Sequence, residues 1–179
     1  MITGGKVRLR PLEPEDVDAL WRWHNDPDVT RWLTERFPES LAELRKRFAE
    51  RGPNTYERVM LGIRQLADDR LIGVCALHGA DPRFGRAELD IYLGEKDAWG
   101  RGNAAEAMRL LCAYGFDELR LHSIQLTVVA ANTDARRLYR RVGFREVGTT
   151  REAFRRAGQW HDVVVMDLLE PKLDRHRPD

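Results

Sequence analysis

A glycine-containing corner is the part of this sequence with the clearest chemical potential. It covers Trp99–Ala104, between a strand-like run that ends at Leu93 and a helical run that starts near Asn103. Gly100 and Gly102 allow backbone conformations closed to other residues, and they let a ligand approach without a Cβ in the way. The first amides of the following helix have no partners within it and carry its positive dipole end. The corner therefore predicts an anion site, most plainly for a diphosphate.

Two diphosphate-binding patterns compete for this corner. Residues 100–105 also fit the loose dinucleotide fingerprint G-x-G-x-x-A. That pattern needs its glycines directly behind a strand, whereas residues 94–99 intervene here, and it needs an acidic residue at the end of the next strand, where Ala131 and Asn132 stand. A Walker phosphate loop is excluded because no Gly-Lys-Ser/Thr follows. A dinucleotide-dependent oxidoreductase stays open as the weaker alternative.

Length, charge and cysteine content limit the class of protein. With 179 residues and a formal net charge of +1, the chain suits one domain with a real core, and no field of one sign favours nucleic acid or a membrane. Cys75 and Cys112 lie in apolar runs and, like the histidines, lack disulfide or metal-ligand spacing. We therefore expect no metal, no membrane segment and a reducing cytoplasmic location. An arginine surplus between residues 100 and 160 suits a polyanionic small ligand; it includes Arg101, Arg136, Arg137, Arg140 and Arg141.

The hydrophobic pattern changes at Gly102. Before it, the sequence predicts helices at residues 13–25 and 40–51 and mostly antiparallel strands at 6–12, 58–66, 71–78 and 86–93. After it come helices at about 103–114 and 133–142 and strands at 123–130, 144–147 and 163–169. The strand, helix, strand unit around the corner should be parallel and right-handed. We predict one mixed α/β domain over residues 1–170 and a loose polar tail over residues 171–179.

Three blocks, in combination and order, resemble the GCN5-related N-acetyltransferases (GNAT), and within them the ribosomal-protein-alanine and spermidine acetyltransferase branch. The blocks are Ala87–Leu93, Trp99–Ala107 and Asn132–Phe144, with a fainter echo at Gly158–Asp162. The resemblance covers essentially the whole chain, but it is close only over residues 86–147. It implies an α/β fold with a single mixed β-sheet, flanked by helices, that splays between the strands at Glu88 and Ser123 and holds acetyl-coenzyme A in the gap.

The resemblance also implies how the coenzyme is held. The amides from Gly100 to Ala104 would hold the diphosphate. The pantetheine arm would pair with the backbone near Ile91 to Leu93 and with Asn132, whose side chain offers both a donor and an acceptor. Two departures, Trp99 in place of the usual Gln or Arg and Ala135 in place of a frequent serine, leave the backbone cradle intact. The predicted coenzyme-binding residues are Ile91, Tyr92, Leu93, Trp99, Gly100, Arg101, Gly102, Asn103, Ala104, Asn132 and Arg137.

Amide formation from a thioester needs a base for the amine, a donor for the oxyanion and an acid for the thiolate. The resemblance implies Tyr139 as the acid, although a tyrosine beside Leu138 also suits a helix face in the core. Strand alternation places Glu88, Asp90 and Tyr92 on one face of the strand. Glu88 is therefore the candidate base, acting directly or through water. Two alternatives remain: a bulge that changes the alternation, and an ion pair between Glu88 and Arg86. The oxyanion is expected to meet a backbone amide near Leu93.

The acceptor is expected to contact the N-terminal elements, where Trp21, His24 and Trp32 cluster in the sequence; the same residues also suit packing of the first helix onto the sheet. We predict an acetyl-CoA-dependent N-acetyltransferase that acts by direct transfer in a ternary complex. The predicted acceptor is a primary amine, either a protein N-terminus, a polyamine or an amino sugar. A non-catalytic coenzyme A-binding regulatory module is the alternative, and a homodimer is compatible with either.

Overall fold

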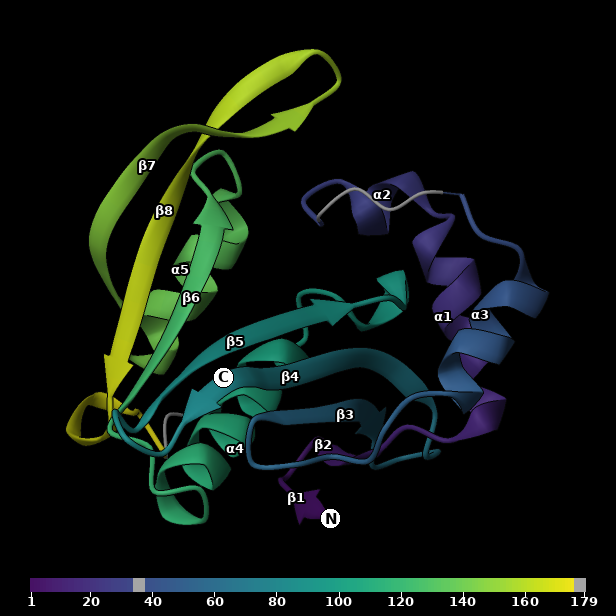
Figure 1. The fold of residues 1–179 in the computed structure, drawn as a ribbon, viewed down its shortest axis with the longest axis horizontal. Helices are drawn as coiled ribbons and strands as arrows, with labels where there is room; N and C mark the ends of the chain where they lie inside the picture. Colours follow the sequence, from purple (N-terminus) through teal and green to yellow (C-terminus); the bar gives the residue numbers. More distant parts are fainter. Residues whose placement is uncertain (34–37, 176–179) are drawn as a thin grey trace.

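A single mixed sheet forms the centre of the protein (Figure 1). The computed structural model describes residues 1–33 and 38–175. In that part of the chain the strand order is β1-β2-β3-β4-β5-β6-β8-β7, and β5 with β6 is the one parallel pair. This topology confirms the mixed sheet and excludes the doubly wound parallel sheet that dinucleotide binding would require. The strands are β1 (Ile2–Thr3), β2 (Val7–Pro11), β3 (Arg58–Gln65), β4 (Leu71–Asp81), β5 (Arg86–Leu93), β6 (Ser123–Val129), β7 (Arg145–Arg156) and β8 (Gln159–Leu169).

Capping residues explain where the helices begin and end. Ser40 and Glu43 form a capping box at the start of the third helix, and Gly143, with φ of 118°, ends the last. The predicted helix over 13–25 begins as a 3-10 turn, and a short helix follows it because the Asp26 side chain accepts from the Asp28 amide. The helices are α1 (Val17–His24), α2 (Pro27–Thr30), α3 (Leu41–Ala49), α4 (Asn103–Asp117) and α5 (Thr133–Val142), with 3-10 turns η1 (Pro14–Asp16), η2 (Lys96–Ala98) and η3 (Glu170–Lys172).

Two hydrophobic clusters hold the helices on the sheet. In the larger cluster, α4 buries Met108, Leu111 and Cys112 against residues such as Leu77 and Leu89 of β4 and β5. In the smaller cluster, α1 and α3 cover residues of β4 and β5 with an apolar set that consists of Leu12, Val17, Leu20, Trp23, Val29, Leu44, Leu71 and Val74. The helices α1 and α3 lie together at one side of Figure 1, away from β7 and β8. Between α1 and α3 on one side and β7 and β8 on the other, part of the sheet face has no covering helix, and Glu88 and Asp90 of β5 are exposed.

The β7–β8 hairpin is longer than the sequence predicted. Residues 144–147 were the expected strand, but β7 extends to Arg156, and Ala157 and Gly158 turn the chain with φ of 49° and 78°. Most of β7 is exposed on both faces, so its sequence carries no apolar alternation. The hairpin tip projects toward α2 (Figure 1), where Arg156 donates to the carbonyl oxygen of Thr30 at 3.1 Å.

The expected loose tail is wrong for residues 171–175. Leu173 is buried in the larger cluster, the Asp174 amide donates to the Val142 carbonyl oxygen, and Arg175 forms an ion pair with Asp117. The prediction failed because one apolar residue among charged ones gives no periodic signal. Residues 176–179, the rest of the predicted tail, lie outside the described residues.

Candidate active site

A wedge opens where the two parallel strands separate. Pairing of β5 with β6 covers only Arg86–Glu88 with Ser123–Gln125, and beyond Glu88 the two strands diverge (Figure 1). β5 stays paired with β4 without a register shift from Glu88 to Leu93, so no bulge changes the strand alternation in this stretch. The splay therefore leaves the far part of β5 with one unpaired edge.

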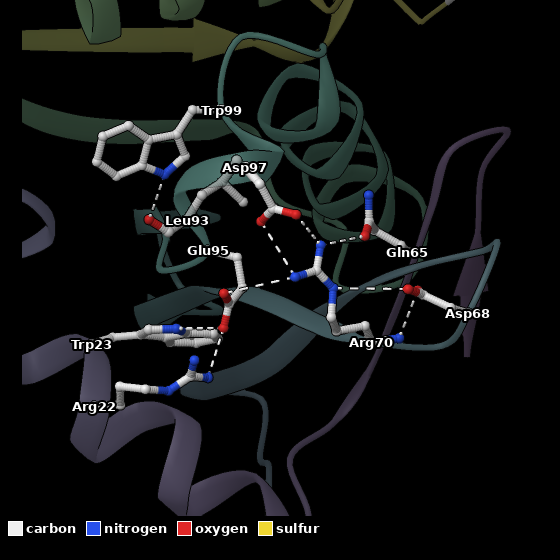
Figure 2. Close-up of polar contacts among 9 residues, drawn as sticks. All are labelled: Arg22, Trp23, Gln65, Asp68, Arg70, Leu93, Glu95, Asp97 and Trp99. Carbon is white, nitrogen blue, oxygen red and sulfur yellow. Dashed lines mark hydrogen bonds and ion pairs between the residues drawn. The ribbon is translucent and has the colours of Figure 1, made fainter.

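The unpaired edge of β5 presents the backbone groups of Ile91 and Leu93. The Gly94 amide donates to the Ile72 carbonyl oxygen on β4, so alternation in an antiparallel ladder turns Tyr92 toward β4 and the residues on either side of it toward the wedge. The Trp99 indole confirms this direction, because its Nε1 donates to the Leu93 carbonyl oxygen at 3.0 Å (Figure 2). An amide-rich ligand entering the wedge would find strand-like partners there.

The glycine corner follows this edge after the segment of residues 94–98, which includes η2. Gly100 and Gly102 have φ of 69° and 82°, and a Cβ at Gly100 would meet nothing within 4 Å, so the backbone is open to a ligand. Among the described residues, no protein acceptor is found for the six consecutive amides from Gly100 to Ala105. The Asn103 side chain is buried and donates to the Ala98 carbonyl oxygen, which fixes the loop. The corner is therefore a rigid set of free donors at the start of α4.

A network of charged side chains ties the corner to α1 and to the β3–β4 turn (Figure 2). Glu95 accepts from Arg22 at 2.7 Å and from the Trp23 indole at 3.0 Å, and Arg70 lies 3.7 Å from its other oxygen. Arg70 also pairs with Asp97 at 2.7 Å. The segment between β5 and α4 is therefore held at several points before any ligand binds.

Asn132 stands on the other side of the wedge, at the start of α5. Its Oδ1 accepts from the Ala135 amide at 3.3 Å, so that oxygen caps the helix. The Nδ2 group has no partner among the described residues and is the part of this side chain that is left to donate to a ligand. The structure thus divides the donor and acceptor roles expected of Asn132.

Tyr139 lies on α5 and packs into the larger hydrophobic cluster, with its ring centroid 6.2 Å from that of Phe144. Burial raises the pKa of Tyr139 to about 12, and the negative charge of Asp90 on β5 adds to the rise. The phenol therefore keeps its proton throughout the physiological range.

Glu88 and Asp90 are exposed on the sheet face that α4 does not cover, as the alternation predicted. Glu88 has no ion pair with Arg86, which instead donates to Gln125 at 3.4 Å. Asp90 is paired with His78 of β4, whose Nε2 lies 3.0 Å from its Oδ2. Sequence reasoning missed His78 because its partner is defined only by the β4–β5 register.

The three predicted acceptor residues do not form one cluster. Trp21 donates to the Glu39 carbonyl oxygen, His24 contacts the Tyr92 hydroxyl at 3.2 Å, and the Trp32 ring lies edge-on to His161 at 5.9 Å. The residue that packs α1 onto the sheet is Trp23, which is 2% exposed. A Cβ on Gly94 would lie 1.9 Å from the Trp23 ring, so the glycine just after β5 is the signal that was missed.

The arginine surplus divides into anchored and exposed side chains. Arg136 and Arg140 both bind Glu146 of β7, and Arg136 also donates to the Ala130 carbonyl oxygen. Arg137 is exposed and lies 3.7 Å from Asp134, so it is weakly held. Of the helix arginines, Arg137 rather than Arg136 or Arg140 has a side chain available for an anion.

The part of the chain that the structure describes holds neither a candidate metal cluster nor a candidate membrane-spanning helix. No group of three His, Cys, Asp or Glu side chains that could hold a metal ion occurs in residues 1–33 and 38–175. No helix in the same part of the chain is both long and apolar enough to cross a membrane. Cys75 and Cys112 are buried, and burial raises the pKa of both thiols, so neither is a ready nucleophile.

Comparison with known proteins decides the family. The acetyltransferase (GNAT) domain family matches residues 6–145. The chain belongs to the GNAT family. The uncharacterized N-acetyltransferase p20 of Bacillus licheniformis is 30% identical over 92% of this chain and 93% of its own. The spermidine N(1)-acetyltransferase of Escherichia coli K12 is 28% identical over 95% of this chain and 89% of its own.

A solved structure shows the same fold with ligands. The spermidine N-acetyltransferase of Vibrio cholerae, crystallised with CoA and spermine, superposes with a TM-score of 0.82 at 27% identity and covers 93% of this GNAT chain and 96% of that one. The predicted family, its fold and its class of enzyme are thereby confirmed. This protein is an N-acetyltransferase rather than a non-catalytic module or an oxidoreductase, and acetyl-CoA is the typical co-substrate of its family.

Proposed function

We propose that this GNAT enzyme transfers the acetyl group of acetyl-CoA directly to a small primary amine bound on the open face of the sheet. The observation that carries the proposal is the wedge. The unpaired edge of β5 borders it, and the six free amides of residues 100–105 follow in the chain after residues 94–99. A diphosphate suits those amides, and an amide-rich arm suits the edge. The acyl group at the end of the arm would then lie near the closed end of the wedge, beside β5 and α5.

Each side of the wedge contributes to holding the coenzyme. The amides from Gly100 to Ala104 bind the diphosphate, with Arg101 and Arg137 exposed nearby for its charge. Ile91 and Leu93 pair with the pantetheine arm through their backbone, and Asn132 donates through Nδ2. The Trp99 indole already donates to the Leu93 carbonyl oxygen. Either Trp99 moves when the arm binds, or the arm contacts Leu93 mainly through its amide. Asn103 and Tyr92 act indirectly, by fixing the loop and the strand.

The reaction needs one proton delivered to sulfur and negative charge stabilised on the carbonyl oxygen. Tyr139 is the proton donor, because it is protonated and lies on α5 at the wedge. The free amide of Leu93 or Ile91 stabilises the oxyanion, since a fixed backbone donor out of water needs no reorganisation. No covalent link to the enzyme is involved, in keeping with the buried and protonated thiols.

The acceptor face favours a cation. Glu57, Glu88 and Asp90 lie near one another around β3, β4 and β5 on the open face, and a protonated polyamine fits carboxylates better than a neutral sugar does. The two spermidine acetyltransferases similar to this chain support the same class. A polyamine is therefore the first acceptor to test, before a peptide N-terminus or an amino sugar.

The test is an acceptor panel with free-thiol release as the readout. Spermidine, an alanine-terminated peptide and glucosamine are each incubated with enzyme and acetyl-CoA, and mass spectrometry locates the acetyl group. We expect turnover with spermidine above the other two. Acetyl-CoA at about 100 times its Kd should also raise the free energy of unfolding by about 2.7 kcal/mol. Absence of both stabilisation and thiol release would refute the proposal.

A further inference from the structure

A hollow on the open face of the sheet lies beside the acidic strand residues. Its volume is about 380 Å³. It joins β4 to the neighbouring strands through two register pairs, Arg58 with His78 and His78 with Glu88. The residues that line it are Glu57, Arg58, Met60, Ala76, His78, Gly79 and Asp90.

His78 is the group in this hollow best prepared to accept a proton. Its Nε2 lies 3.0 Å from Asp90, and a carboxylate can only accept, so Nε2 carries the hydrogen in the neutral ring. Nδ1 is then left as the acceptor. This is the same logic by which a carboxylate orients a histidine base in other enzymes. The His78 side chain is 36% exposed, so a ligand in the hollow has access to it.

Asp90 lies on β5, the strand that borders the wedge. Its carboxylate pairs with His78, and its negative charge also acts on the buried Tyr139 hydroxyl. The pair therefore holds His78 against the strand that borders the wedge. Glu88, by contrast, has no side-chain partner among the described residues that would fix its carboxylate.

We propose that His78 removes the proton from the acceptor amine, with Asp90 as the residue that positions its imidazole. This assignment rests on the proposed function and gives the role of base to His78 instead of Glu88. Glu88 and Glu57 then attract the ammonium form of the acceptor into the hollow.

The protons balance in two steps. The bound ammonium gives one proton to Nδ1 of His78, and the neutral nitrogen attacks the thioester carbon, which forms the C–N bond and places the electron pair of C=O on oxygen. As the C–S bond breaks, sulfur takes a proton from Tyr139, and the second proton on nitrogen replaces it on the phenol. His78 then releases its proton to water, so the products are the amide, the thiol and one proton.

The charged neighbours of His78 lie along the two strands on either side of β4. Glu57 precedes β3 and Arg58 begins it, and Glu88 and Asp90 lie on β5. Three carboxylates and one arginine therefore lie around the imidazole, and their net negative charge attracts a cationic acceptor to it.

The test is the pH dependence of kcat/KM for His78→Gln with spermidine, the peptide and glucosamine as acceptors. At about pH 7 we expect a loss of about 10²-fold that narrows as the amine deprotonates in water, near about pH 8 for the peptide and only toward about pH 10 for spermidine. His122→Gln, an exposed histidine away from the hollow, is the matched control and should keep the wild-type profile. Asp90→Asn should show a smaller loss with the same pH trend.

Three outcomes overturn the assignment or the function beneath it. If His78→Gln is impaired equally at every pH, or if Glu88→Gln shows the narrowing loss instead, His78 is not the base. The Kd for acetyl-CoA and the melting temperature of His78→Gln separate a chemical defect from a misfolded protein, and both should match wild type. If no amine is acetylated by the wild-type enzyme, the proposed function fails and the assignment fails with it.

Discussion

At the scale of single residues, the position of Tyr139 constrains its chemistry. A phenol with a pKa of about 12 is a weaker acid than a thiol, whose usual pKa is about 8.5, so a full transfer to sulfur alone would be uphill. The transfer becomes favourable when the departing nitrogen proton refills the phenol. Tyr139 is thus suited to relay a proton between nitrogen and sulfur, and its hydroxyl must lie close to both.

Replacing Tyr139 with Phe removes only the hydroxyl. We expect kcat to fall by about 10²-fold, while the Kd for acetyl-CoA stays within about twofold, because the wedge and the amides are unchanged. A thiol-release assay gives kcat, and calorimetry gives the Kd for acetyl-CoA. A loss confined to coenzyme binding would show that the hydroxyl serves the ligand and not the reaction.

The raised pKa of Tyr139 also predicts the alkaline side of the pH profile. Because the phenol keeps its proton until pH rises toward about 12, kcat should not decline through ionisation of Tyr139 below about pH 10. A profile of kcat from about pH 7 to pH 10 checks this. An alkaline decline within that range that disappears in Tyr139→Phe would contradict the burial argument.

Residue roles differed in how far the sequence could predict them. The alternation that exposes Glu88 and Asp90 is a local property, and it was confirmed. The His78–Asp90 pair depends on which residues of β4 and β5 face each other, and the sequence does not encode that register locally. The partners of Trp21 and Trp32 likewise belong to distant segments.

At the scale of elements, strong end signals gave accurate boundaries. β5 was predicted as 86–93 and α5 as 133–142, and both agree with the structure because turn residues and Asn132 and Gly143 mark their ends. β7 failed beyond residue 147, since an edge strand exposed on both faces has no apolar period. The helix α2 was missed because four residues give no periodic pattern.

The contact between Gly94 and Trp23 makes a prediction about how α1 is held on the sheet. A Cβ at Gly94 would lie 1.9 Å from the Trp23 ring, so Gly94→Ala should lower the free energy of unfolding by about 3 kcal/mol. Gly148→Ala in β7, where a Cβ meets nothing within 4 Å, is the control and should change it by less than about 0.5 kcal/mol. Urea denaturation of both variants checks the difference, and equal losses would argue against this packing.

At the scale of the whole molecule, residues 171–175 pack back onto the body of the protein. Leu173 is 8% exposed and packs with residues of α4, α5 and the sheet, and the Lys172 carbonyl oxygen lies against Gly143. Length and the lack of a linker predict a single domain, and the strands of the described residues do form one sheet. The anchored segment was not, because its burial depends on a cavity made by elements far away in the sequence.

Leu173→Ala tests whether this segment stabilises the fold. We expect the free energy of unfolding to fall by about 2 to 4 kcal/mol, through lost apolar burial and the cavity left behind. Leu169→Ala, a leucine that is 39% exposed, is the matched control and should cost clearly less. Thermal and urea unfolding measure both, and a loss no larger than that of the control would mean that residues 171–175 contribute little.

The short parallel ladder between β5 and β6 has a consequence for the rigidity of the protein. Two subsheets, β1–β5 and β6–β8, meet along only the pairs from Arg86–Ser123 to Glu88–Gln125. An inserted coenzyme arm would act as a surrogate strand that completes the hydrogen-bonded surface and splints the two halves together. The substrate would then be part of the architecture, and the enzyme would be stiffest in the loaded state and would soften each time its product departs.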